Sequence, residues 1–260
     1  MRARIRQEAP RRGAFLFFAL ALAVQGLALA APPAATERAV VASVVDGDTV
    51  ILADGRHVRL VGINTPERGR DGAPHEPFYA QARALLERQV SGQRVSLVAG
   101  AERVDRHGRT LAHLLLPDGR NVQEGLLEQG LAFAVAIPPN VQFLEPYIAA
   151  ERRARARRAG VWAHPYYAPR PAAELDRGDA GFRLVRGRVQ RVGESRRYVY
   201  LDLSRDVSLM IPRDAWDRSF PGRPQAWRGR DLIARGWLGD QGGKLRMKVY
   251  HPAMIERVGQ

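Results

Sequence analysis

The chain has no cysteine and almost no lysine. Without cysteine among its 260 residues, disulfides, thiolate metal sites and lipid-modified cysteine anchors are all excluded. Of the 41 basic residues only Lys244 and Lys248 are lysine, which leaves 39 arginines and a formal net charge of +14. Arginine grips phosphate with two parallel donors, so this composition favours polyanionic partners. A genome whose base composition enriches arginine everywhere would give the same excess.

Histidine is also scarce, and its positions show no metal-binding spacing. We expect each of the six to be a surface or loop residue, with His107 alone inside a motif; they are His57, His75, His107, His113, His164 and His251. A histidine-based metal centre is therefore not predicted.

The N-terminus has the pattern of an export signal. Five arginines precede an apolar run over residues 14–24, and Ala28-Leu29-Ala30 supplies small residues for cleavage. We expect residues 1–30 to be removed and the protein to be extracytoplasmic, either periplasmic or secreted. The apolar run is short for a membrane span, so we expect no stable membrane insertion after cleavage. The alternative is an uncleaved N-terminal anchor.

Residues 31–38 form an Ala/Pro tether, and after them the pattern predicts a mainly β domain with helices over residues 39–166. Apolar and β-branched runs broken by Asp-Gly turns predict strands at 40–45, 50–52, 58–63, 94–98 and 111–116. Apolar spacing and end signals predict helices at 76–90, 121–130 and 143–159, with Asn121 as an N-cap. Five strands with packed helices favour an OB-fold barrel.

A Pro/Ala-rich linker is predicted at 167–180, followed by a second small OB-like β-domain over 181–258. Its predicted strands are 182–192, 197–203, 208–211, 231–238 and 245–250, with a short helix at 214–220. Arginines, including Arg235, alternate here with Tyr198, Tyr200 and Trp237. Such a pattern suits either a nucleic-acid surface or ordinary core aromatics.

Three polar motifs interrupt the first β pattern. They are Asp46-Gly47-Asp48-Thr49, then Arg59 followed by Ile63-Asn64-Thr65-Pro66-Glu67, then Asp105-Arg106-His107-Gly108-Arg109. Carboxylate and amide oxygens suit a hard cation such as Ca²⁺. Two arginines suit a phosphate that gains charge as it is attacked, and a glutamate beside them can activate water. Each motif alone is weak, but together they indicate a phosphodiesterase site.

In order and spacing, the three motifs resemble those of the staphylococcal nuclease (thermonuclease) family. The resemblance runs from Val40 to Trp162 and includes Gln-Gly-Leu-Ala at 129–132 and the terminal Gly-Val-Trp. It implies that Asp48, Asn64 and the backbone carbonyl of Thr65 bind Ca²⁺.

The same resemblance implies the catalytic roles. Glu67 would be the general base for the attacking water, while Arg59 and Arg109 would hold the scissile phosphate and stabilise its pentacovalent transition state. In that family the 5′-oxygen leaves, so the products carry a 3′-phosphate.

Two residues depart from the family pattern. Asn64 stands where the staphylococcal enzyme has an aspartate, which predicts weaker Ca²⁺ binding because one anionic ligand becomes neutral. His107 stands where an aromatic residue such as tyrosine is usual. The tyrosines that pack on the nucleotide base have no clear counterpart near residues 133–140.

The sequence thus predicts a monomeric, exported, Ca²⁺-dependent endonuclease that cleaves DNA and RNA with little sequence preference, favouring single-stranded or unstructured substrates. The first alternative is a catalytically weak or inactive nucleic-acid-binding protein on the same fold. A further alternative is an envelope scaffold that uses its barrels for protein contacts.

Overall fold

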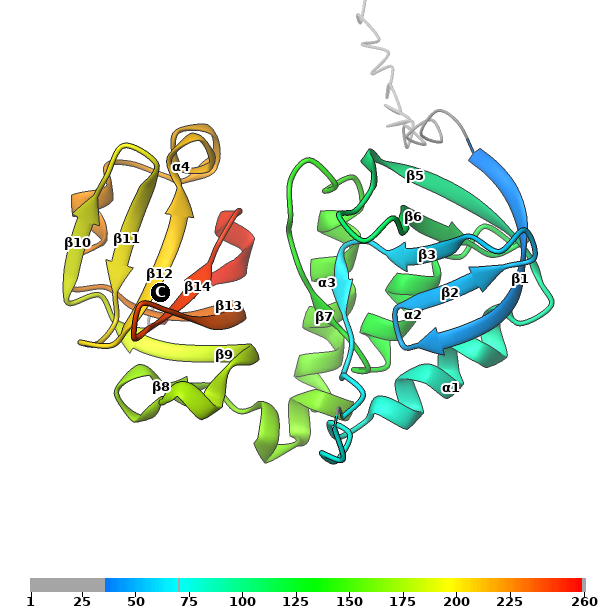
Figure 1. Ribbon diagram of the computed structural model, residues 1–260, viewed down its shortest axis with the longest axis horizontal. Coiled ribbons are helices and arrows are strands. Elements are labelled where there is room, and N and C mark those ends of the chain that lie inside the picture. Colours follow the sequence, from blue (N-terminus) through cyan, green and yellow to red (C-terminus); the bar gives the residue numbers. More distant parts are fainter. Residues whose placement is uncertain (1–35, 70, 259–260) are drawn as a thin grey trace, which may run out of the picture. The chain divides into compact units, whose positions relative to one another are not determined.

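Five strands close into the first barrel of the computed structural model, which describes residues 36–69 and 71–258 (Figure 1). The strands are β1 (Thr36–Asp46), β2 (Thr49–Leu52), β3 (His57–Leu60), β5 (Arg94–Val104) and β6 (Thr110–Leu115), in the order β1-β2-β3-β6-β5. Strand β1 closes the barrel because its first half pairs with β5 and its second half with β2. The predicted OB-fold is therefore confirmed.

The predicted export signal and most of the tether lie outside the described residues. Within residues 36–69 and 71–258, none of the helices combines the length and apolar character needed to cross a membrane.

Alternating apolar residues build the barrel interior. Val50, Leu52, Val58 and Leu60 lie in the core and are at most 1% exposed. The turn between β2 and β3 contains Gly55 at a φ of 85°, a left-handed conformation that glycine adopts without strain. The period of two therefore places these alternate residues of β2 and β3 inside the barrel.

Three helices cover this barrel: α1 (Tyr79–Val90), α2 (Val122–Glu128) and α3 (Leu144–Ala156). Helix α1 begins three residues later than predicted because Phe78 has a φ of 70°, which is incompatible with a right-handed helix. Asn121 caps α2 as predicted, its Oδ1 accepting a hydrogen bond from the Glu124 N–H at 3.1 Å. Helix α3 ends earlier than predicted, at Ala156.

One histidine lies where we did not expect it. His113 belongs to β6 and is 1% exposed, so its predicted surface position is wrong. Its Nδ1 lies 2.7 Å from the hydroxyl of Tyr147, which in turn donates to Oδ1 of Asn121. Burial lowers the pKa of His113 to about 4, so the ring is neutral near pH 7.

The second β-domain is built from β9 (Gly181–Arg188), β10 (Arg191–Glu194), β11 (Tyr198–Asp202), β12 (Val207–Pro212), β13 (Asp231–Gln241) and β14 (Lys244–Lys248). Helix α4 (Arg213–Ser219) follows β12, and the short strands β8 (Arg170–Pro171) and β15 (Ile255–Arg257) complete an eight-stranded sheet.

The strand order of this sheet repeats that of the first barrel. It runs β10-β11-β12-β14-β13-β9, and residues 189–190 alone separate β9 from β10. The segment 181–194 therefore pairs with β13 at one end and with β11 at the other, as β1 pairs with two strands. In both units the third strand pairs in parallel with the last. This is the OB-like order that the sequence predicts.

The segment predicted as a linker contains regular structure. It includes β8, which pairs in parallel with β9, and two 3₁₀ turns, Ala172–Glu174 and Arg177–Asp179. The domain boundaries remain a prediction from the sequence.

Buried contacts join the two barrels. One apolar cluster takes Phe133, Val135 and Val161 from the first part and Tyr167, Phe182 and Leu184 from the second. Arg235 of β13 donates to Oε1 of Glu151 in α3 at 2.7 Å, and both residues are 4% exposed. Of the two readings of this arginine and aromatic pattern, burial excludes a surface phosphate-binding role for Arg235.

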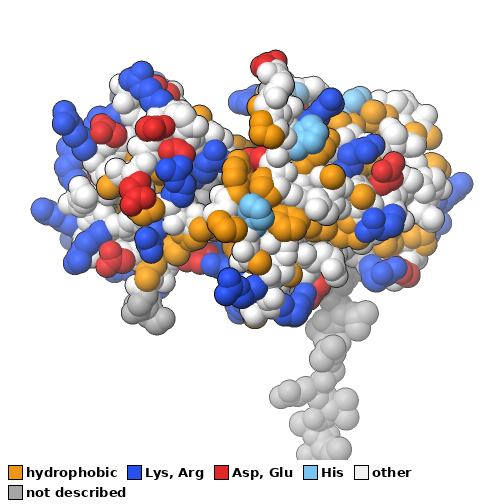
Figure 2. Space-filling model, turned by 90° about the horizontal axis from the view of Figure 1, so that it is seen from below, with side chains coloured by type: hydrophobic (Ala, Val, Ile, Leu, Met, Phe, Trp, Pro, Cys, Tyr) orange, Lys and Arg blue, Asp and Glu red, His pale blue; other side chains and the backbone are white. Residues whose placement is uncertain are grey.

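Ion pairs account for part of the arginine excess. Acidic and basic side chains are interspersed over the second barrel on the face seen in Figure 2. Arg153 pairs with Glu128 at 2.6 Å and Arg191 with Asp202 at 2.7 Å. Exposed pairs of this kind contribute little to stability individually, but they neutralise charge that would otherwise face solvent.

Candidate active site

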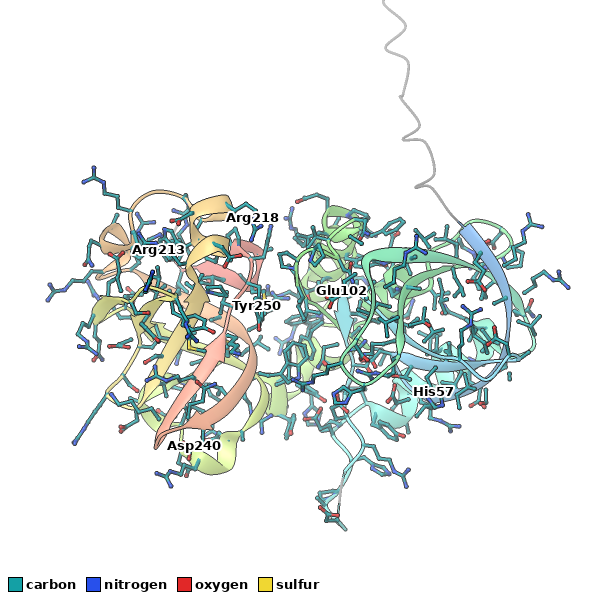
Figure 3. The ribbon with its side chains drawn as sticks, turned by 45° about the horizontal axis from the view of Figure 1, so that its top comes forward. His57, Glu102, Arg213, Arg218, Asp240 and Tyr250 are labelled. Carbon is teal, nitrogen blue, oxygen red and sulfur yellow. The ribbon has the colours of Figure 1, made fainter. Side chains whose placement is uncertain are left out.

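A cavity of about 750 Å³ gathers side chains from all three polar motifs. Among its lining residues are Asp46, Asp48, Arg59, Asn64, Glu67, Glu102, Asp105 and Arg109. Glu102 comes from the end of β5 and is labelled on the first barrel in Figure 3. Segments separated by about forty residues in the sequence therefore meet at one site.

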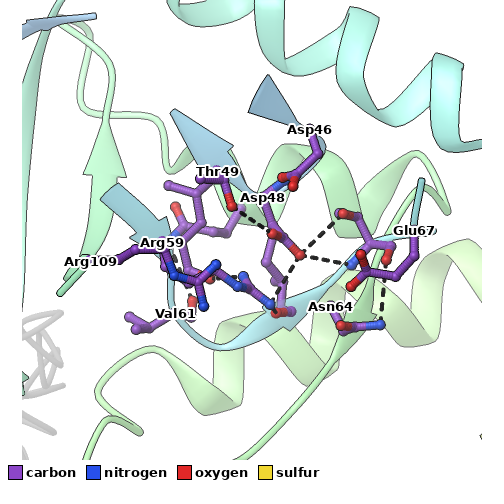
Figure 4. A network of polar contacts seen from close by, with 12 residues as sticks. Asp46, Asp48, Thr49, Arg59, Val61, Asn64, Glu67 and Arg109 are labelled. Atoms are coloured by element: carbon purple, nitrogen blue, oxygen red, sulfur yellow. Dashed lines mark hydrogen bonds and ion pairs between the residues drawn. The ribbon is translucent and has the colours of Figure 1, made fainter. Parts of the chain in front are cut away.

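Asp48 lies at the centre of the polar network (Figure 4). It is 5% exposed, and its Oδ2 accepts hydrogen bonds from the backbone N–H of Thr65 at 3.2 Å and from its hydroxyl at 3.1 Å. Burial raises the pKa of Asp48 to about 6, with Asp46 adding to the rise and Arg59 opposing it. The carboxylate is thus held in place by the loop that carries Thr65.

Gly47 allows this close approach. A Cβ at position 47 would lie 2.7 Å from Oγ1 of Thr65 and 2.9 Å from Cβ of Ala82. Any larger residue between the two aspartates would push the turn away from the 64–65 segment. This is the physical reason for glycine in the Asp-Gly-Asp motif.

Arg59 extends from β3 and is fixed by the backbone around it. Its Nη1 donates to the Leu60 carbonyl at 2.6 Å and its Nη2 to the Ile63 carbonyl at 3.0 Å. Nη2 also lies 3.0 Å from Oδ2 of Asp48. Because these partners restrict the guanidinium, it is preorganised at the cavity wall, where an anionic group would meet it.

Asn64 and Thr65 offer neutral oxygens beside Asp48. Asn64 lines the cavity, and its side-chain Oδ1 is buried without a hydrogen-bond partner among the described residues. Within residues 36–69 and 71–258, no three His, Asp or Glu side chains cluster as a metal site. A cation here would therefore combine the Asp48 carboxylate with amide and carbonyl oxygens, a donor set that fits a hard cation such as Ca²⁺.

Glu67 projects from the segment that follows β4 (Ile63–Asn64). Although the residue is exposed, partial burial of its carboxylate raises its pKa to about 7, and the charges of Asp48 and Asp46 add to the rise. Its backbone N–H donates to Oε2 of Glu76 at 2.8 Å. The side chain lines the same cavity as Arg59 and Arg109.

Arg109 reaches the cavity from the turn between β5 and β6. Its Nε donates to Oδ2 of Asp105 at 2.8 Å, and Oδ1 of Asp105 accepts from the backbone N–H groups of His107 and Arg109. Gly108 has a φ of 79°, so this tight turn requires a residue that tolerates a left-handed conformation. Asp105 thereby sets the direction of the Arg109 side chain.

The structure thus places five of the six predicted site residues on one cavity: Asp48, Arg59, Asn64, Glu67 and Arg109. Thr65 lies behind them, with its hydroxyl and N–H bound to Asp48. Sequence reasoning did not include Asp46 or Glu76 in the site. It named Trp237 only as one aromatic of a possible nucleic-acid surface, and Trp237 lines this cavity. Asp46 stands inside the first motif and accepts from the Asp48 N–H at 3.1 Å. Local sequence gives no comparable signal for Glu76.

Comparisons with known proteins agree with this arrangement. The family model described as "Staphylococcal nuclease homologue" matches residues 57–164. A thermonuclease of Staphylococcus hyicus is 33% identical over 125 residues, covering 46% of this chain and 73% of that protein. A thermonuclease of Staphylococcus intermedius is 35% identical over 130 residues, covering 48% of this chain and 76% of that protein.

A third relative comes from a different genus. Endonuclease YncB of Bacillus subtilis (strain 168) is 29% identical over 128 residues, covering 47% of this chain and 60% of that protein. The matches, together with a closed five-stranded barrel that gathers the three motifs at one cavity, show that the chain belongs to the staphylococcal nuclease family.

Proposed function

We propose that the protein is an exported, Ca²⁺-dependent endonuclease that hydrolyses phosphodiester bonds of DNA and RNA with low sequence specificity and leaves 3′-phosphorylated products. The observation that carries the proposal is the meeting of Glu67, Arg59 and Arg109 beside Asp48 on one cavity. We further propose that it acts as a monomer outside the cytoplasm, on single-stranded or unstructured substrates.

The ligands proposed for the cation are the Asp48 carboxylate, Oδ1 of Asn64 and the Thr65 carbonyl. When bound, Ca²⁺ would supply Lewis-acid charge to the phosphoryl oxygens. The unpartnered Oδ1 of Asn64 supports this proposal, because a buried polar atom without a partner is costly unless a ligand satisfies it.

The remaining chemistry belongs to the side chains. Glu67 takes a proton from the attacking water, a task suited to a carboxylate whose pKa is raised to about 7. Arg59 and Arg109 hold the phosphate and stabilise the negative charge that grows on it. Arg109 is proposed to stabilise the charge on the departing 5′-oxygen, which would leave the phosphate on the 3′-side of the cut.

Incubation of the protein lacking residues 1–30 with single-stranded DNA tests the proposal. Cleavage is expected with Ca²⁺ and not with a chelator, and an Asp48→Ala variant is the matched control because it removes the anionic ligand. The product ends should resist polymerase extension until a 3′-phosphatase has acted. Chelator-resistant cleavage, or products with free 3′-hydroxyls, would contradict the proposal.

One observation favours a second function. The neutral amide of Asn64 replaces an anionic ligand, so a nucleic-acid-binding protein with weak or absent catalysis is the alternative. It would bind DNA with an affinity that falls steeply as salt rises, while forming no product with any divalent metal ion.

A further inference from the structure

The second barrel contributes an aromatic side chain to the candidate active site. Trp237 lies in β13 and lines the same cavity as Glu67, Arg59 and Arg109. It is 39% exposed, which is unusual for a residue whose ring prefers burial.

The alternation of β13 explains how the ring reaches the cavity. Leu232, Ala234 and Leu238 face the core of the second barrel. Residues 233, 235 and 237 face the opposite way, because successive side chains of a strand point to opposite sides. Ile233 packs against the cluster shared by the two barrels, and Arg235 binds Glu151 of α3. Trp237 lies on the same face of β13 as Ile233 and Arg235, at the point where the strand reaches the cavity.

A chain of aromatic contacts supports the ring from behind. The Trp237 ring packs edge-on against Phe182, with 5.1 Å between the ring centroids and 71° between the planes. Phe182 packs on Phe133, also at 5.1 Å. Phe133 belongs to β7 (Phe133–Ala134), where it pairs with Asn64, a proposed Ca²⁺ ligand. The indole is therefore fixed relative to the catalytic residues.

The anchoring of β13 restricts the ring further. Two residues before Trp237, the guanidinium of Arg235 donates both to Glu151 and to the carbonyl of Ala134 at 3.4 Å. Arg235 and Glu151 are both buried. A binding group that is already ordered loses little conformational entropy when a ligand arrives.

We propose that Trp237 is a nucleobase-binding residue, and that its exposed ring stacks on a base of the strand whose phosphate lies between Arg59 and Arg109. The inference rests on the proposed function and extends it, because it gives the second barrel a role in substrate binding. A planar ring suits any of the bases, since stacking does not depend on their hydrogen-bonding edges.

The composition of the cavity explains why stacking is needed. Besides the two arginines and Arg106, five carboxylates line it: Asp46, Asp48, Glu67, Glu102 and Asp105. The negative charges of these carboxylates repel the phosphate backbone, so they offset part of the attraction that the arginines provide. A stacked base adds affinity that does not depend on charge, and it is available only where bases are unpaired. Trp237 therefore favours single strands over duplexes.

Binding of oligothymidylate, and of a strand of the same length made of abasic deoxyribose phosphates, tests the proposal. The measurements use the full mature chain in a Glu67→Gln background, so that the strand is not cut. Trp237→Ala is expected to weaken oligothymidylate binding by about tenfold, the order of one lost base stack. It should leave binding of the abasic strand, and the slope of log K against log salt, unchanged.

Two further variants separate stacking from folding. Trp237→Phe keeps an aromatic face and is expected to retain most of the affinity, with an unchanged melting temperature. Trp162→Phe is the matched control, because Trp162 also packs on Phe133 but does not line this cavity. Oligothymidylate should quench tryptophan fluorescence in the Trp162→Phe protein and not in the Trp237→Phe protein.

Equal loss of affinity for the oligothymidylate and abasic strands would overturn the stacking role, as would unchanged binding of both. Cleavage assays on the unmodified active site keep the two proposals apart. If the protein cleaves DNA and Trp237→Ala leaves KM unchanged, the Trp237 proposal fails alone. If the protein cleaves nothing while Trp237→Ala still loses oligothymidylate binding selectively, the nuclease proposal fails alone.

Discussion

Glu67 and Glu76 are joined by two hydrogen bonds. The N–H of Glu67 donates to Oε2 of Glu76 at 2.8 Å, and the N–H of Glu76 donates to the Glu67 carbonyl at 3.0 Å. The other carboxylate oxygen of Glu76 accepts from the Tyr166 hydroxyl at 3.1 Å. The two hydrogen bonds join the ends of the 67–76 loop, so they fix the backbone of Glu67, the proposed general base.

Loss of this contact should slow the reaction without weakening binding. In Glu76→Ala the Glu67 backbone loses its acceptor, and we expect kcat to fall by about ten- to a hundredfold because the base is misplaced. KM should change little, and Glu76→Gln should restore most of the rate because its amide oxygen still accepts. Steady-state kinetics on single-stranded DNA check this. A Glu87→Ala variant, altered on exposed α1, is the control and should behave like the wild type.

Removal of the proposed base itself has a larger effect. Glu67→Gln keeps the shape of the side chain and removes its ability to take a proton. We expect a fall in kcat of about 10²- to 10⁴-fold, while the dissociation constant for DNA stays close to that of the wild type. Single-turnover kinetics and a binding titration measure the two quantities. Wild-type turnover in this variant would place the base elsewhere.

Restoring an anionic ligand at position 64 should strengthen metal binding. We expect Asn64→Asp to bind Ca²⁺ about tenfold more tightly, since ligand charge tunes calcium affinity. Without metal, the new carboxylate beside Asp48 should lower the melting temperature through repulsion. The rise in melting temperature on Ca²⁺ addition should therefore be larger than in the wild type. Calorimetric titration and thermal unfolding test this, and equal Ca²⁺ affinity in the two proteins would argue against Asn64 as a ligand.

The buried ion pair between the barrels should contribute strongly to stability when one partner is removed. In Glu151→Gln the buried Arg235 keeps only part of the negative charge that balances its own. We therefore expect the free energy of unfolding to fall by about 3 kcal/mol. Denaturant unfolding measures this loss. Glu145→Gln, on an exposed position of the same helix, should change stability by less than about 0.5 kcal/mol. Equal effects at both positions would contradict the prediction.

Acid should destabilise the fold through His113. Its pKa is lowered to about 4 in the folded state from 6.5, so the unfolded state binds more protons between these values and stability falls as pH falls. The full loss is about 3 kcal/mol and is complete only below about pH 4, once the folded state is protonated as well. His113→Gln, which cannot titrate, should show a flatter dependence over pH 4–6.5. Urea unfolding across this range provides the test, and equal slopes would exclude His113.

Local patterns were enough to predict the barrel and most of the site. Alternation placed the strands, the Asn121 cap located α2, and the three motifs identified the residues that meet at the cavity. These features depend on short-range chemistry, namely turn residues, capping and the period of two. Even the OB-like order of the second domain follows from its strand and helix sequence.

Long-range pairing is what the sequence did not show. Glu76 reads as the start of a helix, yet the left-handed Phe78 leaves it in a loop where it holds Glu67. The local pattern around Arg235 does not show whether it is buried, and its distant partners Glu151 and Glu256 make its burial possible. His113 follows the same logic, because its Tyr147 partner lies 34 residues away. Such positions are decided by the tertiary neighbour rather than by the local pattern.

The aromatic and aliphatic cluster between the barrels has a practical consequence. A shortened protein ending near residue 166 would retain every proposed catalytic residue but would uncover Phe133, Val135 and Val161 to water. Exposed apolar surface of this kind promotes self-association. We therefore expect the isolated nuclease barrel to self-associate, because the second domain covers this apolar surface.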